Sequence, residues 1–219
     1  SVVTWGSTYG GDSTAVASAL NGNVDVVQVF STLTAFAALR TDGSVVSWGN
    51  SNFGGDSSAV KNALNGAIDV VQIFSNEKAF AALRVDGSVV TWGDQSTGGD
   101  SSTVSSQLNN VVQIFSTWNA FAALRADGSV VTWGGSSNGA GLGGTGADSS
   151  TVTRKLNGSV DVVNIFSNYS AFAALRADGS VVTWGSTYTG GDSTAVASAL
   201  NGNVDVCLLY TSDAADDTP

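Results

Sequence analysis

The sequence predicts an all-β protein, a partial β-propeller forming an open arc of about four to five blades, with a short helix or irregular edge between blades. Three observations predict it. The fifteen residues AFAALRADGSVVTWG occur at 120–134 and again at 171–185, with near-copies at 35–49 and 79–93. An Asp-Gly pair divides each copy into two apolar runs, which is a strong hairpin signal. The copies recur roughly every 44 residues, a period that suits a propeller blade.

Five tryptophans mark the repeat: Trp5, Trp48, Trp92, Trp133 and Trp184. A glycine-rich insertion at 135–146 lengthens the last interval, and we expect it to be a flexible loop. Residues 1–206 form one repeat domain, truncated at both ends, with units at about 1–43, 44–87, 88–128, 129–179 and 180–206. The string at 207–217 resembles translated sequencing-adapter read-through at the end of a metagenomic fragment, so we treat 207–219 as an artefactual tail.

Each hairpin turn is expected at the Asp-Gly pair, where a glycine accepts positive φ without steric cost: Gly43, Gly87, Gly128 and Gly179. If Asp42 and Gly43 form a two-residue turn, Leu39 faces Val46 and Ala37 faces Trp48. A three-residue loop shifts this register by one residue. In both cases the two faces of the hairpin are largely apolar, which is typical of a sheet packed between two others.

A third strand is predicted before each hairpin by runs such as VDVVQIFS, which are rich in β-branched residues. The segment GGDSSAVKNALNG joins the first two complete units. There, Asp56 is a good N-cap, Val60 and Leu64 lie four apart, and Gly66 follows as the C′ residue. We therefore expect a short helix of about two turns that depends on docking.

These motifs carry a family resemblance. ALRADGSVVTWG, the glycine-containing loop after it and the upstream VVQIFS resemble the repeats of the regulator of chromosome condensation (RCC1). The chain is similar in style to bacterial secreted members such as the β-lactamase-inhibiting propeller protein. The resemblance covers residues 1–206 and implies a propeller that binds other molecules. Histidines and basic segments that suit chromatin are absent from this sequence, so nucleotide exchange and chromatin binding are not carried over.

The composition excludes several kinds of chemistry. The chain has no His and one Cys, Cys207, which lies in the tail. Catalytic triads using His, Cys nucleophiles and zinc sites of the His/Cys type are therefore not expected, and we predict no enzyme, cofactor or metal. One Asp recurs per blade, at Asp12, Asp56, Asp100, Asp148 and Asp192. We interpret this set as capping and turn residues, with a ring of calcium ligands as the alternative.

Charge indicates the class of partner and the location. The net charge is −10, and the eight basic residues are scattered, so nucleic acid and membrane insertion are not expected. The acidic composition, a repeat domain without a thiol and the resemblance to secreted members favour an extracellular or cell-surface location. We expect an unidentified protein partner, with a glycan as the alternative.

The copies differ in two loops, and positions that vary between copies are those that the fold leaves free. Before AFAAL, the variable residues are expected to form an arc on one face and bind a partner, because large aromatic residues dominate interface energetics. This predicted binding set is Leu33, Glu77, Lys78, Trp118, Asn119 and Tyr169. After WG, a secondary set is Tyr9, Phe53 and Tyr188. The alternatives are a carbohydrate-binding or glycoside-acting face and a purely structural spacer in an adhesin-like protein.

Overall fold

The computed structural model describes residues 10–135 and 147–202 of the chain. The expectations for Trp5, Tyr9, residues 136–146 of the glycine-rich insertion and the 207–219 tail lie outside these ranges. The described chain is built from strands joined by short helical turns, which confirms the all-β class. Within those ranges, no helix is long and apolar enough to cross a membrane.

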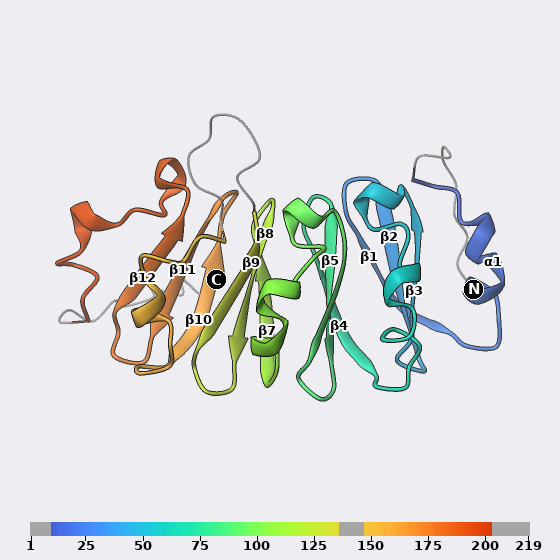
Figure 1. Ribbon diagram of the computed structural model, residues 1–219, viewed down its shortest axis with the longest axis horizontal. Helices are drawn as coiled ribbons and strands as arrows, with labels where there is room; N and C mark the ends of the chain where they lie inside the picture. Colours follow the sequence, from blue (N-terminus) through green and yellow to red (C-terminus); the bar gives the residue numbers. More distant parts are fainter. Residues whose placement is uncertain (1–9, 136–146, 203–219) are drawn as a thin grey trace, which may run out of the picture.

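Four separate three-stranded antiparallel sheets form the described part of the chain, each with its strands in the order of the sequence. They stand side by side along the long axis as four blades of a partial β-propeller (Figure 1). The first blade contains β1 (Val26–Ser31), β2 (Ala35–Arg40) and β3 (Val45–Gly49), and the second contains β4 (Val70–Ser75), β5 (Ala79–Arg84) and β6 (Val89–Gly93). The third contains β7 (Val111–Ser116), β8 (Ala120–Arg125) and β9 (Val130–Gly134), and the fourth β10 (Val162–Ser167), β11 (Ala171–Arg176) and β12 (Val181–Gly185).

The hairpin turn has three residues, so the two-residue register is wrong. Leu39 pairs with Val45, not Val46, and Trp48 pairs with Phe36, not Ala37. The backbone N–H of Arg40 donates to the carbonyl of Ser44 at 3.0 Å, and Gly43 has a φ of 71°. A type I turn followed by a left-handed glycine gives this loop, and it places the tryptophan and phenylalanine of each blade on one face.

The predicted third strand is confirmed as the first strand of every blade. A register shift between Val26 and Gln28 leaves Val27 outside the ladder as a β-bulge, and its side chain is 62% exposed. The same shift occurs in the other three blades, with exposed valines at Val71, Val112 and Val163.

The connecting segments are less helical than expected. Where a two-turn α-helix is expected after Asp56, the structure has a single 3-10 turn, Ser58–Val60. The Asp56 carboxylate accepts the backbone N–H of Ser58 at 2.8 Å, whereas Ser57 holds the N-cap position. The carbonyl of Leu64 instead accepts the N–H of Val45 in β3 at 2.9 Å, so the backbone of this segment is tied to the sheet edge. Among the described residues, the only α-helix is α1 (Ala17–Leu20).

The core lies between successive blades. Between the first two, Ala37 and Leu39 of β2 pack with Phe80 of β5, and Leu64 of the connecting segment completes the cluster. Equivalent clusters lie between the second and third blades and between the third and fourth. Ala37 is fully buried, and its small side chain lets neighbouring sheets approach closely.

Candidate functional site

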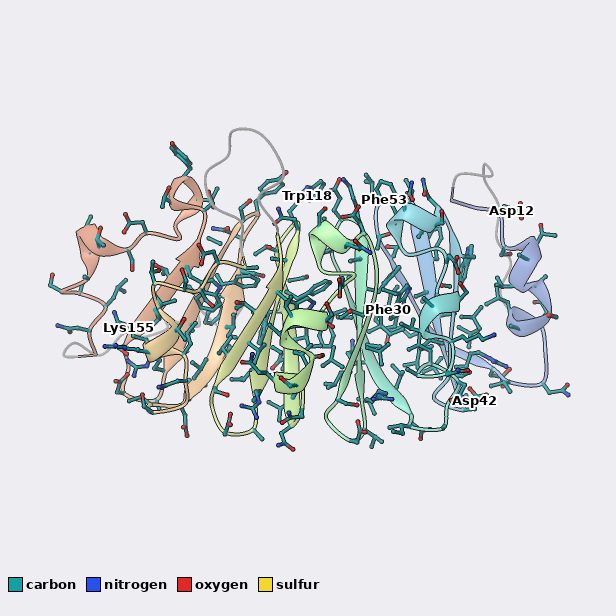
Figure 2. All side chains as sticks on the ribbon, viewed as in Figure 1. Asp12, Phe30, Asp42, Phe53, Trp118 and Lys155 are labelled. Carbon is teal, nitrogen blue, oxygen red and sulfur yellow. The ribbon has the colours of Figure 1, made fainter. Side chains whose placement is uncertain are left out.

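The tight loops between the first and second strands of each blade carry the candidate site. In each loop the middle residue stands at the tip, and together these residues form what we call the tip row: Leu33, Glu77, Trp118 and Tyr169. In Figure 2, Trp118 lies at one edge of the row of sheets, and Asp42 in a hairpin turn lies at the opposite edge. The tips and the hairpin turns are therefore on opposite faces of the propeller.

Backbone hydrogen bonds link the four tips across the blades. The N–H of Leu33 donates to the carbonyl of Glu77 at 2.9 Å, and that of Glu77 donates to the carbonyl of Trp118 at 3.1 Å. The N–H of Trp118 donates to the carbonyl of Tyr169 at 2.9 Å. Since every bond uses main-chain atoms, the loops are aligned regardless of which side chain each one carries.

Three of the four side chains in the tip row are exposed, and Glu77 is the exception. Leu33 is 62% exposed, Trp118 41% and Tyr169 53%. The rings of Trp118 and Tyr169 stack with their centroids 5.1 Å apart and their planes at 25°. Stacking of this kind stabilises an aromatic pair by about 0.5–1.5 kcal/mol beyond area burial, so the two rings form one preorganised apolar surface.

Leu33 and Trp118 border an open hollow, which is also lined by Ser75, Asn76, Glu77 and Thr117. The Glu77 side chain is 15% exposed, and its carboxylate lies 3.7 Å from the ammonium of Lys78. Lys78 in turn lies 5.5 Å from the centre of the Phe53 ring. The hollow thus combines two apolar walls with a charged pair at its side.

Phe53 of the secondary loop set lies at the same edge of the sheets as Trp118 of the tip row (Figure 2). Phe53 ends the 3-10 turn Ser51–Phe53, and its carbonyl accepts the hydroxyl of Thr32 in the neighbouring tip loop at 2.9 Å. Tyr188, in the turn Thr187–Thr189, is 80% exposed. The two loop sets are adjacent because the tip loops and the ends of the third strands share one edge of each sheet.

The first position of each tip loop is a positioning residue that sequence reasoning missed. We interpreted all of the variable residues as free, but Asn76 is constrained. Its amide donates to the carbonyl of Thr97 at 2.6 Å, and its side-chain oxygen accepts the N–H groups of Lys78 and Ala79. The corresponding residues are Thr32, Thr117 and Asn168, and the restriction to Thr or Asn was the available signal.

The third position differs between blades. Lys78 is paired as described above, whereas the side-chain oxygen of Asn119 is buried without a hydrogen-bond partner among the described residues. Asn119 adjoins the exposed Trp118, so an unsatisfied acceptor lies beside the largest aromatic ring of the tip row. A buried acceptor left unpaired costs about 1–3 kcal/mol.

The repeat tryptophans and glycines belong to the framework. Each repeat tryptophan in the described ranges is at most 4% exposed and stacks on the phenylalanine opposite it, with centroids 5.1–5.4 Å apart: Trp48, Trp92, Trp133 and Trp184. The turn glycines all have φ between 71° and 79°: Gly43, Gly87, Gly128 and Gly179.

The recurrent acidic residues are engaged in turns. Asp86 accepts the hydroxyl and the backbone N–H of Ser88, and these bonds lower the pKa of its carboxyl group. Arg84 lies 4.0 Å from the same carboxylate. Asp100 accepts the N–H of Ser102, which likewise lowers its pKa. No group of three or more potential metal-binding side chains is found in the described part of the chain.

Similarity to known proteins is found among solved structures alone. No protein-family model and no curated protein sequence matches the chain. Among solved structures, it is similar to a chain from the crystal structure of Kap60 bound to yeast RCC1 (Prp20), with 20% identity over 80% of this chain and 45% of that one and a TM-score of 0.49. It is also similar to Prp20p from Saccharomyces cerevisiae (19% identity, 74% and 44% covered, TM-score 0.47) and to human WBSCR16 (22% identity, 75% and 48% covered, TM-score 0.46).

The chain spans about half the length of these structures. At such identities the similarities concern architecture alone. The assignment to a partial β-propeller depends on the four stacked sheets, and the function is argued from the loops of this chain.

Proposed function

We propose that the chain is a non-enzymatic binding module that recognises a protein through the tip row, within a larger bacterial exported protein. The observation that carries the proposal is the exposed, stacked pair of Trp118 and Tyr169 on main-chain-aligned loops. Because the two rings are already held against each other, binding loses less side-chain entropy than it would with mobile side chains. Aromatic residues in this setting account for much of the binding energy in protein interfaces.

The hollow beside the pair supports a protein ligand. Its walls, Leu33 and Trp118, suit an apolar side chain, and Ser75, Asn76 and Thr117 add polar groups to its lining. A polypeptide supplies both kinds of group at short spacing. Glu77 and Lys78 add charges at the side of the hollow, which favour a defined orientation of the partner.

A peptide selection tests the tip row directly. The purified chain is panned against a random peptide display library, and the affinities of the selected peptides are measured for the wild type and for the double variant Trp118→Ala/Tyr169→Ala. We expect the double variant to bind at least about tenfold more weakly. The matched control is Val112→Ala, which removes an equally exposed side chain from the bulge of β7 and leaves the tip row intact.

Equal affinity of the selected peptides for the wild type and the double variant would refute recognition through this row. A glycan array run on the same proteins separates the carbohydrate alternative: glycan binding that is lost in the double variant, with no peptide selected, replaces the protein proposal. If the chain is a structural spacer, no peptide is selected and no glycan binds.

The proposed export rests on composition. Acidic residues outnumber basic ones by 18 to 8, and the one Cys lies in the tail rather than in the repeats. An exported repeat domain without thiols needs no control of disulfide pairing. Recovery of the surrounding gene checks this part: an encoded partner domain of cytosolic type, with no export signal, would contradict it.

A further inference from the structure

Two segments of the chain, nearly 180 residues apart, have almost the same sequence. Residues 1–26 read SVVTWGSTYGGDSTAVASALNGNVDV, and residues 180–206 repeat this string with Thr189 as the one addition. The ten residues from Asp12 to Asn21 are identical to those from Asp192 to Asn201. Both ten-residue segments lie within the described ranges, one against the first blade and the other against the fourth (Figure 1).

The three junctions between neighbouring blades show how a connecting segment of this type packs. In each inner junction, a leucine of the connecting segment is buried between two blades: Leu64 is 2% exposed, Leu108 4% and Leu156 3%. In the first two junctions, a tryptophan of the following blade also donates its indole N–H to a glycine carbonyl of the preceding one. Trp92 bonds to Gly54 at 3.0 Å and Trp133 to Gly98 at 3.1 Å.

The fourth blade exposes the face that would precede the next blade. Leu175 and Ala173 of β11 are half-buried, whereas their counterparts Leu39 and Ala37 in the first blade are 7% and 0% exposed. A Cβ placed on Gly190 would meet only the Asn168 amide at 3.9 Å, whereas one on the equivalent Gly54 would clash with Phe80 of the next blade at 2.6 Å. The described chain therefore leaves this face without a neighbouring blade.

The first blade exposes part of the opposite face, beside the part that Leu20 of α1 covers. Val29 of β1 is 42% exposed, although its counterpart Ile73 in the second blade is 1% exposed. The indole N–H of Trp48 is buried and has no hydrogen-bond partner within residues 10–135 and 147–202. In the second and third blades this group bonds to the glycine loop of the preceding blade. The first blade thus has an unmet donor where the fourth blade has a free glycine loop.

We propose that the exposed face of the fourth blade in one copy of the chain binds the exposed face of the first blade in a second copy. This junction lies at the ends of the row of blades and is distinct from the tip row. The Trp48 indole would donate to the Gly190 carbonyl of the other copy, and Leu175 would cover Val29. The interface repeats the packing that the three inner junctions already show.

The duplicated segment makes this association possible without a new contact type. At the junction, the Asp12–Asn21 segment of one copy and the Asp192–Asn201 segment of the other would claim the same position. Because their ten residues are identical, either segment can occupy the position between the two blades equally well, and the other segment would be displaced from it. Exchange of an identical element between copies is a low-cost route to assembly.

Analytical ultracentrifugation of the full chain tests the proposal, at concentrations from about 1 to 500 µM. We expect reversible, concentration-dependent association. Val29→Asp should raise the dissociation constant at least about tenfold, because it places a charge in an apolar junction. Val27→Asp is the matched control on the same strand, since the counterparts of Val27 are exposed even in the inner blades.

A mixing experiment tests the direction of the contact. Leu175→Asp blocks the fourth-blade face and Val29→Asp blocks the first-blade face, so each variant alone should be monomeric. Because each retains the face that the other has lost, an equimolar mixture should form a one-to-one dimer that grows no further. Circular dichroism of each variant verifies that it is folded, and a folded pair that does not associate overturns the proposal.

Two further results would also overturn it. One is a wild-type chain that stays monomeric at every concentration, as expected if another segment covers both faces. The other is association that Val27→Asp weakens as much as Val29→Asp does. Trp48→Phe gives a readout of the proposed hydrogen bond, with a several-fold weaker association expected.

Discussion

Replacing Trp92 by Phe tests the hydrogen bond that connects neighbouring blades. The Trp92 indole is 4% exposed and donates to the carbonyl of Gly54, a buried residue of the preceding blade, at 3.0 Å. Phenylalanine keeps the aromatic stack on Phe80 but removes the donor and part of the ring. Trp48 provides a matched comparison, because it has the same exposure and a similar stack, but its buried indole N–H has no partner in the described part of the chain.

The magnitude follows from the difference between the two sites. Loss of ring volume destabilises both variants by about 1–3 kcal/mol. Trp92→Phe also leaves the buried Gly54 carbonyl unpaired, which costs about 1–3 kcal/mol more. Trp48→Phe removes an unsatisfied donor and avoids this second loss. At this chain length, 1 kcal/mol shifts Tm by roughly 2–4 °C, so Trp92→Phe should melt at least about 2 °C below Trp48→Phe.

Differential scanning calorimetry on dilute protein measures both Tm values without association between copies. The wild type is scanned beside the two variants, and circular dichroism verifies that each retains its β-structure. Equal losses of Tm in the two variants, or a larger loss in Trp48→Phe, would refute the reasoning about the bond between blades.

Three further outcomes are expected. Gly54→Ala should lower Tm more than Gly190→Ala, because both positions have positive φ but only the Cβ added at Gly54 would clash with the following blade. Equal losses of Tm would mean that backbone strain alone accounts for the destabilisation. Asn76→Ala should destabilise the fold by about 1–3 kcal/mol in urea unfolding, and Asn76→Thr should recover most of this loss, since Thr32 fills the same position in the first blade. The turn residues Asp86, Asp127 and Asp178 each have a pKa lowered by a serine hydroxyl and a backbone N–H, so they stabilise the fold fully above the unfolded pKa of about 4 and lose this effect as the pH falls through the folded pKa values. Tm measured against pH should therefore decline below about pH 4, with no histidine step near pH 6. A constant Tm down to pH 2 would contradict this expectation.

The strands were predictable because local and long-range signals agree in them. The Asp-Gly pair, the β-branched runs and the apolar character of both faces all point to a blade packed between neighbours. The length of the turn was not predictable, since a two-residue and a three-residue loop both keep the hairpin apolar. The choice depends on Ser44, whose hydroxyl and N–H bond to Asp42 and whose carbonyl accepts the N–H of Arg40.

The connecting segments and the candidate site depend on contacts between distant residues, which the spacing of residue types in the sequence does not predict. A two-turn helix at Asp56 would be locally reasonable, but the carbonyl of Leu64 bonds to the edge of β3 instead. The row of tips arises only when blades stack and their loops reach hydrogen-bonding distance. Asn76 was overlooked because its partner Thr97 lies 21 residues away, in the loop after the third strand.

The main-chain bonds between tips bear on how such a protein changes over generations. Near-identical coding segments favour unequal recombination, which duplicates or deletes a blade as a unit. A tip that is aligned by its backbone can then acquire a new side chain in each descendant while its neighbours stay in place. The same architecture would let ligand preference diversify quickly with little loss of foldability.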